Sequence, residues 1–134
     1  MSRAGQKGLI RARLADERGT LKRVAARALC LCYPSPYHVA MSSLGYQTIY
    51  RLVNQLPGWS AARAFLPDKD EPLGGEALLT YEDEQPVGAY PVIAFSVAYE
   101  LELTGLFDCL TFSGLPVLAR ERDERHPLIL AGGP

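Results

Sequence analysis

One local order of elements restricts the fold of this chain more than any other sequence feature. Apolar side chains predict a strand at 27–32, and a loop whose backbone is restricted by two prolines, Tyr33–Ser43, follows it. A helix is then predicted over 43–56, with Ser42 or Ser43 as its N-cap. Strand, loop and helix in this order form the first unit of an open α/β sheet, in which ligands bind beyond the carboxyl ends of the strands.

The alternation of strands and helices continues along the rest of the chain. The run at 92–97 is continuously apolar, which is typical of a central parallel strand buried on both faces. We therefore predict the α/β class: an open, mostly parallel, Rossmann-like or flavodoxin-like sheet, flanked by helices and joined by right-handed crossovers. The other predicted elements are strands at 61–66, 115–118 and 128–131, a short strand or turn of helix at 76–81, and a helix around 103–110.

Residues 1–26 are basic and have no clear pattern. The first 27 residues carry eight Lys or Arg side chains and two carboxylates, although the whole chain has a net charge of −1. Apolar residues at 9–14 and 20–24 predict a β-hairpin that turns at Gly19, with a disordered arm as the alternative. A basic arm can bind nucleic acid or an acidic neighbouring domain, or it is a solvated terminal segment. We expect two units, residues 1–26 and 27–134.

Three cysteines, an odd number, are typical of a protein from a reducing compartment. Cys30 and Cys32 lie two apart in a predicted strand, so their side chains share one face. Neither they nor Cys109 show the spacing of a redox pair or a metal site, and we expect all three to be buried hydrophobic residues. No apolar stretch approaches the ~20 residues of a membrane-spanning helix, and no signal peptide is visible. These features predict a cytoplasmic protein that does not contact a membrane.

A candidate ligand site lies where the loops after three predicted strands open on the same edge of the sheet. These loops supply aromatic and hydrogen-bonding side chains, and the pair Gly132-Gly133 permits close approach of the backbone to a ligand. The arrangement suits a nucleotide-like ligand or a large planar cofactor. Each residue also has a plainer interpretation as part of a surface loop or a tight turn. The candidate residues are Pro34, Tyr37, His38, Met41, Ser42, Ser96, Tyr99, Glu100, Gly132 and Gly133.

Several enzyme classes are excluded because their motifs are missing. The chain contains neither GxGxxG nor GxxxxGK[ST], the two loops that bind phosphates in nucleotide-binding folds. It also lacks the G-x-S-x-G nucleophile elbow of α/β hydrolases, and no spacing of Cys and His fits zinc. No catalytic and no metal-binding residue is therefore predicted.

Four segments, taken in order, resemble one protein family. They are ALCLCYPSPYHVAMSSLG at 28–45, AFLPD at 64–68, IAFSVAYEL at 93–101 and ERDERHPLILAGGP at 121–134. The match over residues 27–134 is to the N-terminal, Rossmann-like and cobalamin-binding-like domain of radical SAM iron–sulfur oxidoreductases. In that family this domain precedes a barrel whose C-x3-C-x2-C motif binds a [4Fe–4S] cluster and S-adenosylmethionine.

The chain departs from the full family pattern at two motifs. It has no C-x3-C-x2-C, so the resemblance implies that the cluster and S-adenosylmethionine are bound elsewhere in a parent protein. It also has no D-x-H-x-x-G, through which one class of cobalamin domains supplies a histidine to cobalt. Since the last predicted strand ends at Ala131 and a helix should follow, we expect the parent protein to continue past Pro134.

The resemblance implies an accessory domain without catalytic residues of its own. Its candidate residues would hold cobalamin or shape a substrate cavity beside the barrel of the same parent chain, with an RNA or a protein as a further partner. An alternative is a cofactor-free interaction module that docks a partner domain or RNA. A free-standing flavodoxin-like domain that binds flavin is a third hypothesis.

Overall fold

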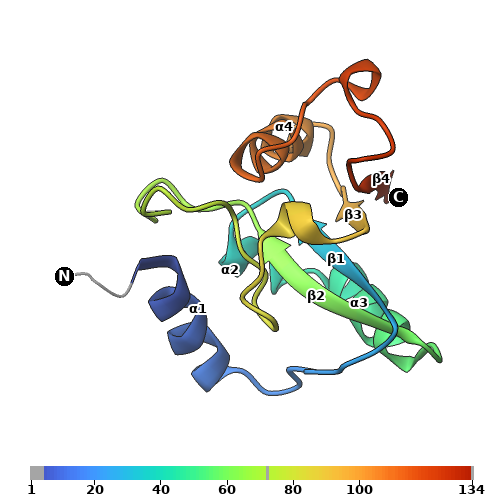
Figure 1. Ribbon diagram of the computed structural model, residues 1–134. Coiled ribbons are helices and arrows are strands. Elements are labelled where there is room, and N and C mark those ends of the chain that lie inside the picture. Colours follow the sequence, from blue (N-terminus) through green and yellow to red (C-terminus); the bar gives the residue numbers. More distant parts are fainter. Residues whose placement is uncertain (1–4, 72, 134) are drawn as a thin grey trace.

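The computed structural model describes residues 5–71 and 73–133. Its centre is a sheet of four parallel strands in the order β2-β1-β3-β4 (Figure 1). β1 (Arg27–Tyr33) pairs with β2 (Trp59–Phe65) on one side and with β3 (Val92–Ser96) on the other, and β4 (Leu128–Gly132) pairs with β3. The predicted α/β class with an open, parallel sheet is confirmed.

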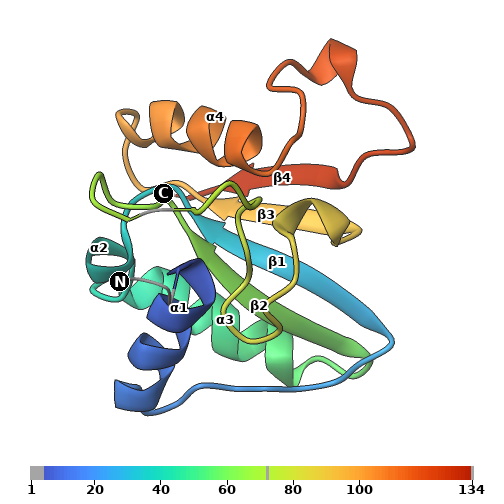
Figure 2. The ribbon, with the colours of Figure 1, turned by 60° about the vertical axis from the view of Figure 1, so that its left-hand side comes forward.

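Helices cover both faces of the sheet (Figure 2). On one face Tyr46 of α3 packs with Leu31 and Phe65, and on the other Leu110 of α4 packs with Cys32 and Phe95. The helices are α1 (Gly5–Asp16), α2 (Tyr37–Ala40), α3 (Leu44–Gln55) and α4 (Glu102–Phe112), with short 3-10 turns η1 (Val87–Ala89) and η2 (Ala119–Glu121). None of the described helices is long and apolar enough to cross a membrane.

Local signals place both ends of α3. At its start Ser43 is the N-cap, and its hydroxyl accepts a hydrogen bond of 3.2 Å from the Tyr46 N–H. At its end Pro57 and Gly58 follow, and Gly58 has a φ of +81°, which glycine adopts without strain. The predicted helix at 43–56 is therefore confirmed to within one residue at each end.

The three cysteines are free and buried, as predicted. Cys30 and Cys32 lie on the α4 face of the sheet, and Cys109 of α4 packs in the same cluster. Burial raises the pKa of the Cys30 and Cys32 thiols well above its ordinary value. These thiols therefore act as small hydrophobic residues rather than as reactive groups.

The prediction for the N-terminal segment was wrong within the described residues. Neither a hairpin at 9–14 and 20–24 nor a disordered arm is present, because residues 5–16 form α1. Ile10 is buried in the hydrophobic cluster on the α3 face of the sheet, which also contains Tyr46 and Phe65. The Gln6 side chain donates to the Ala77 carbonyl and accepts from the Leu79 N–H. These contacts with residues distant in sequence stabilise a helix that its own apolar pattern does not reveal.

Three further predictions need correction. Residues 115–118 do not form a strand, because Arg122 rather than a neighbouring strand bonds the carbonyls of Pro116 and Val117. Segment 76–81 forms one isolated antiparallel bridge, from Leu79 to Pro86, and does not extend into a strand. β3 lies inside the sheet as predicted but alternates between buried and half-buried residues, since α3 contacts β2 and does not cover the β3–β4 half.

Candidate functional site

The carboxyl ends of β1, β3 and β4 lie at one edge of the sheet, because all the strands are parallel. The loop after β1 and the start of α4 enclose a pocket of about 370 Å³ at this edge, which we call the rim pocket. Its size falls within the range of small-ligand sites, about 300–1,000 Å³. Its lining residues are Pro34, Ser35, Val39, Leu66, Tyr99, Leu101, Glu102, Thr104, Gly105 and Asp108.

A buried carboxylate, that of Glu102, fixes one wall of the rim pocket. Its Oε1 accepts hydrogen bonds from the N–H groups of Ala98 at 2.7 Å and Tyr99 at 3.2 Å. Its Oε2 accepts a hydrogen bond of 2.9 Å from the Ser35 hydroxyl in the loop after β1. Glu102 is the first residue of α4, where a negative charge also interacts favourably with the helix dipole. One side chain therefore joins the loops that follow β1 and β3.

A close backbone approach fixes the other wall. A Cβ placed on Gly105 of α4 would lie 2.2 Å from the carbonyl oxygen of Pro34. Only glycine permits this distance, so α4 packs directly on the loop after β1. One wall of the rim pocket is thus held by the hydrogen-bonded Glu102 side chain and the other by direct packing of backbone segments.

The mouth of the rim pocket is apolar and faces solvent. Val39, Tyr99 and Leu101 are 49%, 68% and 89% exposed. Side chains of this kind usually lie inside a protein, and an exposed group of them marks a surface that contacts a ligand or another protein. Serine, threonine and carboxylate groups within the same pocket offer hydrogen bonds to orient what binds there.

Six of the sequence-predicted residues lie along or near this edge, but only two of them, Pro34 and Tyr99, line the rim pocket. Ser96 is half-buried at the end of β3, and Glu100 is exposed in the turn before α4. Gly133 packs against the backbone, since a Cβ there would lie 1.7 Å from the Val97 carbonyl oxygen.

Gly132 ends β4, and its carbonyl accepts a hydrogen bond of 2.8 Å from the Val97 N–H. The glycine pair therefore brings the end of β4 close to the segment after β3. In this structure the close approach that was predicted for Gly132-Gly133 is made to the protein's own backbone.

The other predicted residues of the loop after β1 lie away from the rim pocket. Tyr37 is buried, its ring stacks on Tyr81 with centroids 5.4 Å apart, and its hydroxyl donates to Glu17. Burial, together with that carboxylate, raises the pKa of Tyr37. His38 and Ser42 are exposed, and the Ser42 hydroxyl donates to the His38 carbonyl at 3.2 Å.

Sequence reasoning missed most of the residues that line the rim pocket, above all Glu102. It selected Glu100 instead, two positions earlier in the same Glu-Leu-Glu segment. A carboxylate in the first turn of a helix that follows a strand is the available signal, because it can accept hydrogen bonds from the free N–H groups there. The exact start of α4 decides which glutamate this is, and the sequence leaves that start open by a few residues.

The described residues do not fit an iron–sulfur cluster. No group of three or more His, Cys, Asp or Glu side chains within residues 5–71 and 73–133 could hold a metal ion. The three thiols are buried in the hydrophobic cluster beneath α4. No histidine is among the residues that line the rim pocket, so a corrinoid there would receive no histidine ligand from those side chains.

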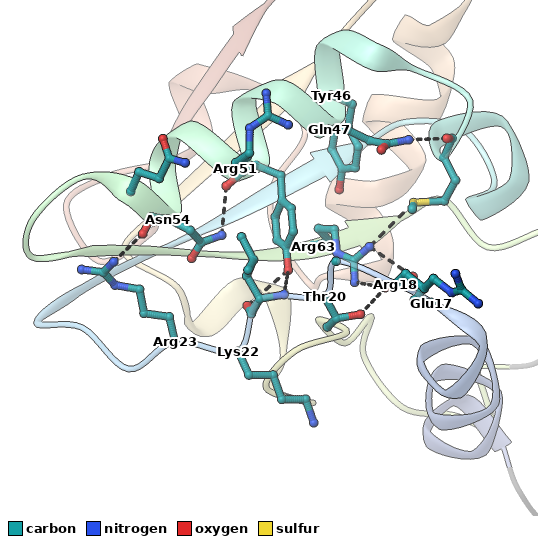
Figure 3. Close-up of a pocket in the computed structure, with 15 residues that line it drawn as sticks. Glu17, Arg18, Thr20, Lys22, Arg23, Tyr46, Gln47, Arg51, Asn54 and Arg63 are labelled. Carbon is teal, nitrogen blue, oxygen red and sulfur yellow. Dashed lines mark hydrogen bonds and ion pairs between the residues drawn. The ribbon is translucent and has the colours of Figure 1, made fainter.

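A second, larger pocket of about 630 Å³ lies between residues 17–23 and α3, and we call it the basic pocket (Figure 3). Of the predicted residues, Met41 lines it. Its floor includes Arg63, which is buried and pairs with Glu17 at 2.7 Å and with Glu82 at 2.6 Å. Burial alone would lower the pKa of Arg63, but the charges of Glu82 and Glu17 outweigh burial and raise it.

Comparison with known proteins assigns the chain at the level of the family. A family model described as "Radical SAM proteins, N-terminal" matches residues 45–134. The comparison with curated proteins finds no match, and the comparison with solved structures finds none either.

Proposed function

The chain belongs to the family of radical SAM N-terminal domains, and from that membership we propose that it is a non-catalytic accessory domain of a radical SAM protein. In this proposal its rim pocket faces the catalytic barrel of the same protein and forms one side of a site for a corrinoid or for the substrate. The iron–sulfur cluster and S-adenosylmethionine belong to the barrel. We also propose a cytoplasmic location, in keeping with three free cysteines.

The observation that carries this proposal is the exposed apolar mouth of the rim pocket. Val39, Tyr99 and Leu101 surround a cavity at the carboxyl ends of parallel strands, where α/β folds bind their ligands. A corrin ring is large and planar, with apolar faces and amide side chains at its edge. The apolar mouth can contact such a face, and Ser35 and Thr104 can bond its amides.

The chain's own residues would position the ligand and exclude water from it. Glu102 holds the loops after β1 and β3 in one arrangement before any ligand arrives, so that less conformational freedom is lost on binding. Cobalamin, when bound, would supply methyl transfer or one-electron chemistry through its cobalt. No residue lining the rim pocket needs to act as an acid, base or nucleophile in this proposal.

Titration with hydroxocobalamin tests the proposal directly. The visible spectrum should change on binding, and the corrinoid should stay with the protein on desalting. Replacing Leu101 by Ser removes exposed apolar surface at the mouth and should weaken binding about tenfold or more. Leu56→Ser is the matched control, because Leu56 is also exposed but lies at the far end of α3.

A cofactor-free docking module is the second candidate, and the same exposed apolar mouth favours it. In that case hydroxocobalamin leaves the spectrum unchanged, both with this chain and with the whole radical SAM protein. The Leu101→Ser change would then weaken association with the separately expressed barrel, and Leu56→Ser would not. If Leu101→Ser weakens neither hydroxocobalamin binding nor association with the barrel, both candidates are contradicted.

A further inference from the structure

Apart from Met41, the basic pocket is lined by residues outside the candidate ligand loops. The coil Glu17–Arg23 forms one wall, and Tyr46 to Gln55 of α3 form the other (Figure 3). With about 630 Å³ it lies in the middle of the size range of small-molecule sites. It is separate from the rim pocket, since no residue lines both.

The charge of this pocket is strongly positive, although the whole chain carries a net charge of −1. Its lining contains a single carboxylate, that of Glu17, which accepts hydrogen bonds from Thr20, Tyr37 and Arg63. Its negative charge is paired with the positive charge of Arg63 at 2.7 Å, so its repulsion of an anion in the pocket is weakened. The cationic lining residues are Arg18, Lys22, Arg23, Arg51 and Arg63.

Cations on both walls are available to a ligand. Arg18, Lys22 and Arg51 are exposed, and no hydrogen bond or ion pair to another described residue engages their side chains. Figure 3 shows the Lys22 and Arg51 side chains extending from opposite walls and away from one another. Like charges repel, and an anion between the walls would attract both.

The floor of the pocket is rigid and already satisfied. Tyr46 donates to the Leu31 carbonyl at 2.7 Å, and Tyr50 donates to Glu82 at 2.6 Å. Arg63 lies over the Tyr50 ring, 4.7 Å from its centroid. Such a floor keeps its shape when the exposed cations at the mouth turn toward a ligand, and that preorganisation favours binding.

We propose that the basic pocket binds a small molecule carrying two or more phosphate groups. Two or more phosphates can reach cations on both walls, and guanidinium and ammonium groups form charge-assisted hydrogen bonds with phosphate oxygens. Single-stranded RNA fits less well, because its bases stack on exposed aromatic rings and Tyr46 and Tyr50 are buried. The site is additional to the proposed corrinoid or substrate site.

Calorimetric titration of the chain with inorganic pyrophosphate and with ATP, at an ionic strength of about 0.15 M, tests this. Lys22→Ala and Arg51→Ala should each weaken binding about tenfold, and the double variant should weaken it further. Arg120→Ala is the control, since Arg120 is an exposed cation on η2 that does not line the pocket. It should leave the affinity within about twofold, because exposed charges beyond a Debye length are largely screened.

Three results would overturn the proposal. The first is no binding of either probe at millimolar concentration, and the second is equal weakening by Arg120→Ala and Arg51→Ala. The third is tight binding of a single-stranded RNA that neither pyrophosphate nor ATP can displace. Circular dichroism and the thermal midpoint of each variant show that the fold is kept. Hydroxocobalamin binding should not change in the double variant, so a failure here is distinguishable from a failure of the proposed function.

Discussion

Removing the positive charge of Arg63 is the most direct test of how the N-terminal coil is held on the sheet. The Arg63 side chain is 3% exposed and lies between two carboxylates, those of Glu17 and Glu82, which are 7% and 2% exposed. Its Nε bonds Glu82 at 2.6 Å and its Nη2 bonds Glu17 at 2.7 Å. Arg63→Met keeps much of the side-chain volume but leaves two buried carboxylates without their cation.

The expected loss of stability follows from this geometry. Removing one partner of a buried ion pair costs about 3–5 kcal/mol, because the other charge stays buried and unpaired. Domains of this size are stable by about 5–15 kcal/mol, so the change removes a large share of the total. In urea unfolding, with an m value of about 2 kcal/mol/M, the midpoint should fall by about 2 M. Arg51→Met makes the same chemical change on the exposed face of α3 and should shift stability by no more than about 0.5 kcal/mol.

The free energy of unfolding should depend on pH with opposite signs in the unaltered chain and in Arg63→Met. In the unaltered chain burial alone would raise the pKa of Glu17, but hydrogen bonds from Arg63, Tyr37 and Thr20 outweigh burial and lower it below its ordinary 4.5. A lowered pKa in the folded state gives stability that is present above pH 4.5 and is lost as the pH falls through the folded value. Without Arg63 burial dominates, the pKa of Glu17 rises, and the variant gains stability as the pH is lowered toward 4.5.

Urea midpoints measured between about pH 8 and pH 4.5 therefore test whether the buried ion cluster stabilises the fold. The predicted outcome is a large destabilisation of Arg63→Met at pH 8 that becomes smaller on acidification. If Arg63→Met and Arg51→Met have the same midpoint at pH 8, or if acid does not narrow their difference, the buried ion cluster is not part of the folded protein. The coil that forms one wall of the basic pocket would then have to be held by other contacts.

Three other changes probe the rim and α3. Gly105→Ala places a Cβ 2.2 Å from the Pro34 carbonyl and should destabilise the fold by about 1–3 kcal/mol in chemical denaturation, despite alanine's higher helix propensity; equal or higher stability would contradict the close packing. Glu102→Ala leaves the Ser35 hydroxyl and two N–H groups without their acceptor, so the free energy of unfolding should fall by about 1–3 kcal/mol. Hydrogen exchange of those two amides should become faster, and unchanged exchange would refute this role of Glu102. Ser43→Ala removes the α3 N-cap and should lower the free energy of unfolding by about 1 kcal/mol, whereas Ser42→Ala, at an exposed neighbour, should not.

The sheet and α3 were predictable because their signals are local. Continuous apolar runs end at prolines, glycines or charged residues at both ends of β1 and β3. Ser43 and Pro57 mark the limits of α3, whose buried residues Tyr46, Tyr50 and Asn54 repeat at helical spacing. A strand and a helix of this kind bury enough apolar surface on one another to form wherever the rest of the chain permits.

The elements that could not be predicted depend on contacts between distant residues. α1 presents few apolar side chains of its own, and its docking depends on Ile10 and on bonds from Gln6 to segment 77–79. The ion cluster joins Glu17, Arg63 and Glu82, three residues that no local pattern connects. Candidate residues such as Tyr37 were chosen because their loop follows a strand, but the direction of each side chain depends on partners elsewhere in the fold.

The two outer strands of the sheet, β2 and β4, differ in how far their free sides are protected, and this bears on how another part of a radical SAM protein can approach. Beside β2, Asn54 accepts from the Ala61 N–H at 3.1 Å and Glu82 accepts from the Arg63 N–H at 2.8 Å. The Tyr81 N–H donates to the Arg63 carbonyl at 2.8 Å. Side chains and one coil thus occupy the groups that an added strand would need, which is a common protection of sheet edges.

The β4 edge has no such protection among residues 5–71 and 73–133, where β4 pairs only with β3. Leu128 and Leu130, which share the α3 face of the sheet, are 58% and 48% exposed because α3 covers only the β2–β1 half. Free backbone groups and exposed leucines together favour the addition of protein at this side. The segment after β3 that leads to Tyr99 and Leu101 begins at Val97, whose N–H donates to the Gly132 carbonyl of β4. A partner that pairs with β4 would therefore lie one strand away from the start of the segment that leads to the mouth of the rim pocket.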